Sequence, residues 1–134
     1  MILGIGCDIA QISRFMKTEK FLHRFVEKHL TPAEQREIQK KIESQNKNEA
    51  VAALATIFAA KESVSKALGT GFQMGITLKD IEITHDEQGC PHVKLYKNAL
   101  NRAYELSKNQ QFTMHITLSN EREYANAVAV LECK

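Results

Sequence analysis

Apolar and polar positions alternate along this chain with two different periods, which separate predicted strands from predicted helices. Strict alternation runs through residues 112–119 and 124–132, and a polar tetrapeptide joins the two segments. This pattern predicts a β-hairpin. Residues 81–85 and 92–96 flank a turn-rich hexapeptide and predict a second hairpin. Residues 2–7, a short apolar run with two glycines, are typical of a buried strand.

The first helices are predicted by apolar spacing and by a capping pattern. Between residues 13 and 29, apolar side chains recur at helical spacing with charges between them, which indicates one or two short amphipathic helices. In the sequence TPAE, Thr31 suits the N-cap, Pro32 the first helical position and Glu34 the third, as in a capping box. A helix should therefore begin here and run to about Ser44.

A longer helix follows a polar loop predicted over residues 44–49. Residues 49–68 are rich in alanine and contain neither proline nor glycine, so propensity favours one long helix that Gly69 ends as a left-handed C-cap. A loop runs through Gly75, and residues 97–108 are helical in pattern. This order of elements predicts an α+β fold in which an antiparallel sheet packs against the long central helix.

The composition is that of a globular protein and disfavours several functional classes. The 134 residues predict one domain, 1–134, with a core of its own. With 18 basic and 16 acidic residues the net charge is +2, which is too balanced to indicate nucleic-acid binding. Three widely spaced cysteines predict neither a disulfide framework nor a zinc site. The N-terminus resembles neither a signal peptide nor a membrane span, so a cytoplasmic location is expected.

The long helix carries charged residues where its apolar face ends. Leu54, Phe58, Glu62 and Lys66 form one i, i+4 row that starts among core candidates. Glu62 should therefore be half-buried beside the loop that begins at Gly69. The alternative is an exposed Glu–Lys ion pair, which would contribute roughly 0.3–0.5 kcal/mol.

Gly69, Gly71 and Asp8 each allow two interpretations. Glycines let a phosphate group approach the backbone closely, but either glycine can equally belong to an ordinary helix C-cap. Asp8 follows a predicted buried strand, where an unpaired acid is costly. It either caps a helix near residues 9–12 or joins Glu62 in binding a hard cation such as magnesium, which often takes one or two carboxylates together with substrate phosphates.

Three segments carry a family resemblance: GIGCDIAQISR (residues 4–14), FAAKESVSKALGTG (58–71) and LKDIEI (78–83). In this order they resemble the holo-[acyl-carrier-protein] synthases, the small members of the 4′-phosphopantetheinyl transferase superfamily. The central family motif reads approximately F-[AS]-x-K-E-[AS]-x-x-K-A-[LF]-G-[TS]-G. The resemblance covers most of the chain, including the turn at residues 89–91 and the last two strands, and it implies the 4′-phosphopantetheinyl transferase fold.

The resemblance implies a magnesium-dependent enzyme. Phosphopantetheine would pass from coenzyme A to a serine of an apo acyl carrier protein, leaving adenosine 3′,5′-bisphosphate, in support of fatty acid biosynthesis. Asp8 and Glu62 match the magnesium ligands, Lys66 matches the lysine that faces the phosphates, and these three are the expected catalytic residues. Either Glu62 or a water molecule would accept the serine proton. The expected contacts to coenzyme A are Lys61, Lys66, Gly69 and Gly71.

The family also implies two kinds of protein contact. One is a homotrimer with active sites at the subunit interfaces. The other is the carrier protein, which is strongly acidic, so a basic surface on the first helix should dock it. The candidates for this surface are Arg14, Arg24, Phe25 and Lys28. For the last three, a solvated amphipathic helix with Phe25 in the core is an equal alternative, whereas Arg14 is interpreted as functional.

Two positions depart from the family pattern. Several relatives have arginine where this chain has Ile57, and Asn120 stands at a polar position that is often histidine in relatives. Contacts made by those side chains to coenzyme A cannot be transferred to this chain, and Lys47 is a candidate substitute. A non-catalytic α+β module that binds a nucleotide or a partner helix is the second hypothesis, but such a module has no obvious use for two metal-ligating acids.

Overall fold

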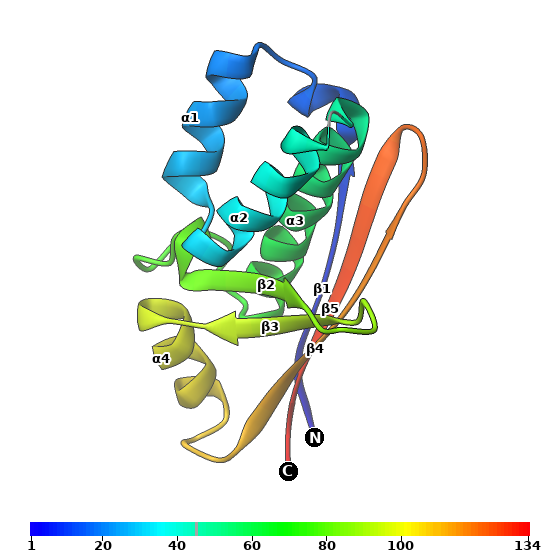
Figure 1. The fold of residues 1–134 in the computed structure, drawn as a ribbon. Helices are drawn as coiled ribbons and strands as arrows, with labels where there is room; N and C mark the ends of the chain where they lie inside the picture. Colours follow the sequence, from blue (N-terminus) through cyan, green and yellow to red (C-terminus); the bar gives the residue numbers. More distant parts are fainter. Residues whose placement is uncertain (45) are drawn as a thin grey trace.

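A long helix and a three-stranded antiparallel sheet form the centre of the molecule (Figure 1). The computed structural model describes every residue except 45. Strands β1 (Ile2–Gln11) and β4 (Phe112–Asn120) flank β5 (Tyr124–Cys133), and α3 (Lys47–Ala67) packs against this sheet. The predicted α+β fold, with its long central helix, is confirmed.

The sheet meets α3 through small side chains. Alternate residues of β5 are buried: Ala125, Ala127, Ala129, Leu131 and Cys133. Successive side chains of a strand point to opposite faces, so the alternation in the last predicted hairpin marks the face that α3 covers.

Strand β1 approaches α3 so closely that two of its residues must be glycine. A Cβ atom on Gly6 would lie 1.8 Å from the Ser63 carbonyl oxygen, and one on Gly4 would lie 1.9 Å from the Ala67 carbonyl oxygen. These contacts are with backbone atoms of α3, which cannot move aside. The strand also continues past its predicted end, residue 7, to Gln11.

Three short helical elements follow β1: η1 (Ile12–Phe15), α1 (Glu19–His29) and α2 (Pro32–Glu43). The capping box at the start of α2 is confirmed. The Thr31 amide donates to Glu34 Oε1 at 2.8 Å, and the Glu34 amide donates to Thr31 Oγ1 at 3.4 Å. Local sequence therefore determines where α2 begins.

The long helix starts earlier than predicted. It begins at Lys47, and the side chain of Asn46 caps it by accepting from the Glu49 amide at 3.1 Å. The predicted loop over 44–49 is therefore partly helical, and residue 45 within it lies outside the described residues.

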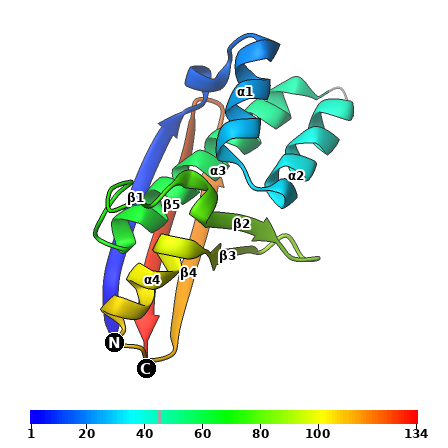
Figure 2. The ribbon, with the colours of Figure 1, turned by 90° about the vertical axis from the view of Figure 1, so that its left-hand side faces the viewer.

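A second sheet, of two strands, lies beside the first. Strands β2 (Ile81–His85) and β3 (Pro91–Leu95) form the predicted hairpin, which follows η2 (Leu78–Asp80) and precedes α4 (Lys97–Leu106). In Figure 1 this hairpin lies between α2 above it and α4 below it. Figure 2 shows α1 and α2 at one end of the molecule and the two termini at the other.

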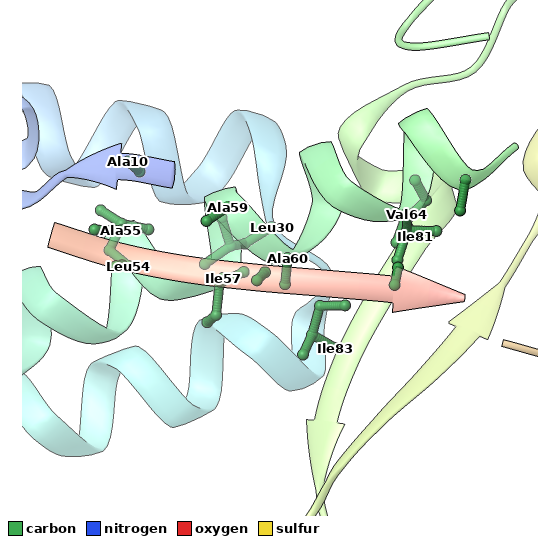
Figure 3. Close-up of a cluster of buried hydrophobic side chains, with 14 of the residues drawn as sticks. Ala10, Leu30, Leu54, Ala55, Ile57, Ala59, Ala60, Val64, Ile81 and Ile83 are labelled. Atoms are coloured by element: carbon green, nitrogen blue, oxygen red, sulfur yellow. The ribbon is translucent and has the colours of Figure 1, made fainter. Parts of the chain in front are cut away.

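The core surrounds α3, where this helix meets the three-stranded sheet, α2 and β2 (Figure 3). Its fully buried large side chains include Leu30, Leu54, Ile57, Val64, Ile81 and Ile83. In the part of the chain that the structure describes, no helix combines the length and apolar character needed to span a bilayer.

Candidate active site

Asp8 and Lys66 meet where β1 passes the last turn of α3. The Lys66 ammonium donates a hydrogen bond to Asp8 Oδ1 at 3.1 Å and another to the Cys7 carbonyl at 3.0 Å. The Asp8 side chain is 17% exposed, whereas the Lys66 side chain is 49% exposed. A largely buried carboxylate thus lies beneath an ammonium group that is open to solvent.

Glu62 lies one turn of α3 before Lys66 and is half-buried. Burial raises the pKa of its carboxyl above the usual value, and the negative charge of Asp8 raises it further. The positive charges of Lys66 and Arg14 lower this pKa in turn. The charged groups of Asp8, Lys66 and Arg14 therefore lie close enough to Glu62 to change its pKa. The structure brings Asp8, Glu62 and Lys66 together as the sequence predicts.

Asp8 does not cap a helix. It lies within β1, opposite Ala127 of β5, whereas the next helical turn begins at Ile12 with Gln11 as its N-cap. The helix-cap interpretation of Asp8 is therefore wrong. A carboxylate on the helix-facing side of a strand is costly unless a cation or donor pairs with it, and Lys66 is such a partner.

The i, i+4 row of α3 passes from the core to the surface as predicted. Leu54 is 2% exposed, Phe58 and Glu62 are half-buried, and Lys66 is exposed. Because Lys66 pairs with Asp8 of β1, the alternative of a simple Glu–Lys pair on the helix surface does not describe this site.

The two glycines that follow α3 have different surroundings. Gly69, with φ +76°, completes a Schellman motif, because its amide donates to the Lys66 carbonyl and the Thr70 amide donates to the Ser65 carbonyl. The predicted C-cap role of Gly69 is confirmed. Gly71, with φ +59°, has open space where a Cβ atom would lie. A ligand can therefore approach the backbone there.

Lys61 is not part of this site. Its side chain is 1% exposed, and its ammonium donates to Glu34 Oε1 at 2.7 Å, to the Leu78 carbonyl at 2.7 Å and to the Ile81 carbonyl at 2.6 Å. An ammonium has three hydrogens and all three are used. The prediction that Lys61 contacts coenzyme A is therefore wrong, because the side chain points into the core.

Arg14 lies on the rim of the site. Its guanidinium carbon is 5.8 Å from the centre of the Phe58 ring, a cation–π contact that holds it one turn of α3 away from Glu62. Its charge acts on Glu62, as the effect on the Glu62 pKa shows. Arg14 is exposed and so available to a partner.

The predicted docking residues of α1 differ in their surroundings. Arg24 and Lys28 are exposed on the helix surface. Phe25 is half-buried, with its ring centre 5.5 Å from that of Phe15 and 6.1 Å from that of Phe58. The structure thus favours the core interpretation for Phe25 and leaves the two cations free for a partner.

The residues that depart from the family pattern are engaged elsewhere. Ile57 is 2% exposed and belongs to the core. The Asn120 amide donates to Thr56 Oγ1 at 3.2 Å and so joins the end of β4 to α3. Lys47 begins α3, about 20 Å along the helix axis from Glu62.

Two carboxylates are available to hold a metal ion at this site. Among residues 1–44 and 46–134, no group of three or more His, Cys, Asp or Glu side chains forms a complete protein-only metal site. Asp8 and Glu62 supply oxygen ligands, and magnesium commonly takes one or two carboxylates and completes its shell with water and substrate phosphates. The donor set therefore fits magnesium bound together with a phosphate-containing ligand.

The sheet face opposite α3 is open, and it is apolar along β1. On β1, Ile5 is 67% exposed and Ile9 is 63% exposed, and Val130 and Val128 of β5 lie in register beside this strand. Contiguous exposed apolar surface usually marks a protein contact. This surface is not predicted from the sequence, in which the apolar run at residues 2–7 indicates a buried strand. The available signal was the alternation of glycine and Asp8 with bulkier residues.

The family comparison matches residues 4–129 to the 4′-phosphopantetheinyl transferase superfamily. Two relatives illustrate the similarity in sequence, both called holo-[acyl-carrier-protein] synthase. That of Maridesulfovibrio salexigens is 42% identical over 134 residues, covering 98% of this chain and 99% of the relative. That of Halorhodospira halophila is 39% identical over 132 residues, covering 98% of each chain.

Solved structures give the same result for the fold. A holo-[acyl-carrier-protein] synthase from Neisseria meningitidis superposes with a TM-score of 0.80 at 33% identity, covering 98% of this chain and 99% of that one. A holo-(acyl-carrier-protein) synthase from Bacillus anthracis, in complex with CoA (3′,5′-ADP), superposes with a TM-score of 0.78 at 31% identity, covering 100% and 99%.

Proposed function

Since the chain belongs to the 4′-phosphopantetheinyl transferase superfamily, we propose that it is a holo-[acyl-carrier-protein] synthase. It transfers 4′-phosphopantetheine from coenzyme A to a serine of an apo acyl carrier protein and releases adenosine 3′,5′-bisphosphate, in the cytoplasm and in support of fatty acid biosynthesis. The observation that carries this proposal is the meeting of Asp8, Glu62 and Lys66 from two elements far apart in sequence.

The reaction replaces one phosphorus–oxygen bond by another. The serine oxygen attacks the phosphorus atom that carries pantetheine, the bond from that phosphorus to the leaving bisphosphate breaks, and the serine hydroxyl loses its proton. Lys66, which Asp8 and the Cys7 carbonyl hold in place, directs its exposed ammonium at the phosphate oxygens. Fixed positive charge where negative charge develops is a large source of catalysis.

Glu62 is the proton acceptor that the site offers, directly or through a water molecule bound to it. Burial raises the pKa of its carboxyl, so without a bound metal its carboxylate is a stronger base than an exposed glutamate. Burial and the neighbouring Asp8 produce this property, so it depends on the fold rather than on the glutamate alone.

Asp8 and Glu62 are also the residues that would hold magnesium. When bound, such an ion would supply positive charge to offset the negative charge on the phosphate oxygens and the leaving bisphosphate. The pairing of Lys66 with Asp8 at 3.1 Å holds this carboxylate at the site.

The carrier protein docks on the basic side of α1 and η1. Arg14, Arg24 and Lys28 are exposed and attract an acidic partner over a distance of about 10 Å at moderate salt. Arg14 stands nearest to Glu62 and so links the docking surface to the site.

The active form is a homotrimer that buries the open face of the sheet, with active sites at the subunit interfaces. Two isoleucines more than 60% exposed, Ile5 and Ile9, are unusual on a surface that stays in water. They lie on the same strand as Asp8, so an assembly through this face brings a second subunit close to the site.

The proposal is tested by incubating the protein with coenzyme A, magnesium and an apo carrier protein, and weighing the carrier by mass spectrometry. We expect the carrier to gain the mass of phosphopantetheine and EDTA to abolish the gain. A carrier that stays unmodified under all metal conditions would favour a non-catalytic binding module.

The role of Glu62 is tested by Glu62→Gln, which keeps the shape of the side chain but removes its charge. We expect kcat to fall by at least about 10²-fold with the fold intact by circular dichroism. Glu87→Gln, at the exposed tip of the β2–β3 hairpin, is the matched control and should behave as wild type. Wild-type turnover in Glu62→Gln would contradict the assignment.

A further inference from the structure

A fully buried ion pair on another side of α3 takes no part in the chemistry above. Lys61 is 1% exposed, Glu34 is 0% exposed, and their charged atoms are 2.7 Å apart. Such groups are almost never fully buried unless they are paired. Apolar residues of similar volume often stabilise a protein as well as a buried pair does, so stability alone explains this pair poorly.

The ammonium of Lys61 joins α3 to the segment that enters β2. Besides Glu34 Oε1, it donates to the carbonyl of Leu78, the first residue of η2, and to the carbonyl of Ile81, which directly follows this turn. Three acceptors around one nitrogen require three hydrogens, so the group is an ammonium ion. Burial lowers the pKa of Lys61, and the Glu34 carboxylate beside it raises that pKa in turn.

The carboxylate of Glu34 joins the same segment to the start of α2. Oε1 also accepts from the Thr31 amide at 2.8 Å, and Oε2 accepts from the Ile83 amide at 2.8 Å. One pair of side chains thus connects the first turn of α2, the middle of α3 and strand β2. Its geometry is closed, because every hydrogen of the ammonium and both carboxylate oxygens have partners.

The direction of the Lys61 side chain is linked to that of Glu62 by helix geometry. Lys61 precedes Glu62, and successive residues of an α-helix are about 100° apart around the axis, so the direction of one side chain fixes the direction of the next. Toward the sheet, α3 is fixed by the contact of its Ser63 carbonyl with Gly6 of β1. The helix is therefore held between two rigid contacts, one on each side of Glu62.

We propose that Lys61 and Glu34 are positioning residues for the reaction. Their buried pair sets the rotation of α3 about its axis and so holds Glu62 toward Asp8, without touching substrate. The inference rests on the proposed transferase function, and it assigns to the lysine of the Lys-Glu motif a role at the core rather than at the phosphates.

The central test is Lys61→Met, which keeps most of the unbranched apolar stem and removes the ammonium group with its three hydrogen bonds. Misplacement of a reacting group by about 1 Å can cost about 10²-fold in rate. We expect kcat per folded molecule to fall at least about tenfold, while the KM for the carrier protein stays within about twofold of wild type. The docking surface lies on α1, which the substitution does not touch.

A second measurement separates positioning from stability. Mn²⁺ binding in the presence of coenzyme A, followed by electron paramagnetic resonance, should weaken in Lys61→Met, because the two carboxylates no longer face each other. Ile38→Ala, in the buried face of α2, removes packing near Glu34 but leaves the ion pair in place. Even where Ile38→Ala lowers Tm as much as Lys61→Met does, this control should keep the wild-type kcat per folded molecule and the wild-type affinity for Mn²⁺.

Glu34→Gln extends the test should Lys61→Met fail to fold. It keeps the volume of Glu34 and weakens the pair, so kcat and Mn²⁺ affinity should both fall while the KM for the carrier protein holds. If the variant that folds matches Ile38→Ala in both readouts, the pair only stabilises the fold and the inference is overturned. A wild-type protein that does not modify the carrier would instead refute the proposed function.

Discussion

At the residue scale, the environment of Glu62 is unfavourable for the folded chain and useful for chemistry. An ionised carboxylate that is half-buried beside a second carboxylate destabilises the protein in the absence of a bound cation. The same arrangement yields a stronger base and a pair of oxygen ligands. Trade-offs of this kind between stability and activity are common at active sites.

This trade-off predicts a pH-dependent gain of stability in Glu62→Gln. Because the pKa of Glu62 is higher in the folded state than in the unfolded state, its contribution is most favourable at acid pH and is lost as the pH rises through the folded-state pKa. The metal-free variant should therefore melt at a higher temperature than wild type near pH 8. The gap should close below about pH 4, where both states are protonated. A constant gap at every pH would exclude titration of Glu62 as the cause.

At the element scale, the site depends on the close contact between β1 and α3. Asp8 comes from the strand, and Glu62 and Lys66 come from the helix. The glycines of β1 permit this contact, because any side chain there would collide with helix backbone. The spacing between the two elements is thus part of the site.

Gly6→Ala tests this contact. Its Cβ atom would lie 1.8 Å from the Ser63 carbonyl oxygen, so α3 must move away from β1. We expect a loss of about 3 kcal/mol or more in the free energy of unfolding, together with loss of turnover. Gly89→Ala, at φ +84° with no atom within 4 Å, should cost only about 1 kcal/mol and keep full activity. Similar effects in the two variants would refute the packing argument.

Helix α1 belongs to the same scale, because none of its residues is fully buried and its cations face solvent. Charge reversal in Arg24→Glu should raise the KM for the carrier protein about tenfold at low salt and flatten its salt dependence, with kcat unchanged. Steady-state kinetics at several ionic strengths give the comparison. Lys134→Glu, at the opposite end of the molecule in Figure 2, should leave the KM as it is. An unaltered KM in Arg24→Glu would move docking to another surface.

At the scale of the whole molecule, one face of the central sheet carries α3 and the other is open. The open face is apolar at Ile5 and Ile9 and is formed by the strand that carries Asp8. An isolated chain would leave this surface in water, whereas an assembly through it would bury the surface next to the site.

Ile5→Lys tests the assembly. A charge in the middle of this face should leave each chain folded but reduce the mass measured by light scattering from trimer to monomer, and activity should fall with it. Met74→Lys is the matched control, because Met74 is 66% exposed in a loop and Ile5 is 67% exposed in the sheet. A trimer that survives Ile5→Lys with full activity would show that assembly uses another face.

Features with a local cause could be predicted from the sequence. The capping box at Thr31 and the C-cap at Gly69 are confirmed because each depends on contacts within a few residues. The i, i+4 row through Glu62 follows from helix geometry alone. The sequence allowed two interpretations of Asp8, a helix cap or a partner of Glu62. It could not decide between them, because it does not show whether the first strand ends before residue 8.

The remaining features depend on how the elements are placed around one another. The sequence shows a lysine at residue 61 but not whether its side chain faces the phosphates or the core. The rotation of α3 relative to α2 and β2 decides this and directs the Lys61 side chain to Glu34. Likewise, the exposure of Ile5 depends on which face of the sheet the helix covers. Helix caps and helical spacing depend on residues close together in the sequence. The rotation of α3 about its axis and the choice of the sheet face that it covers depend instead on packing between segments that are distant in sequence. That packing exists only in the folded molecule.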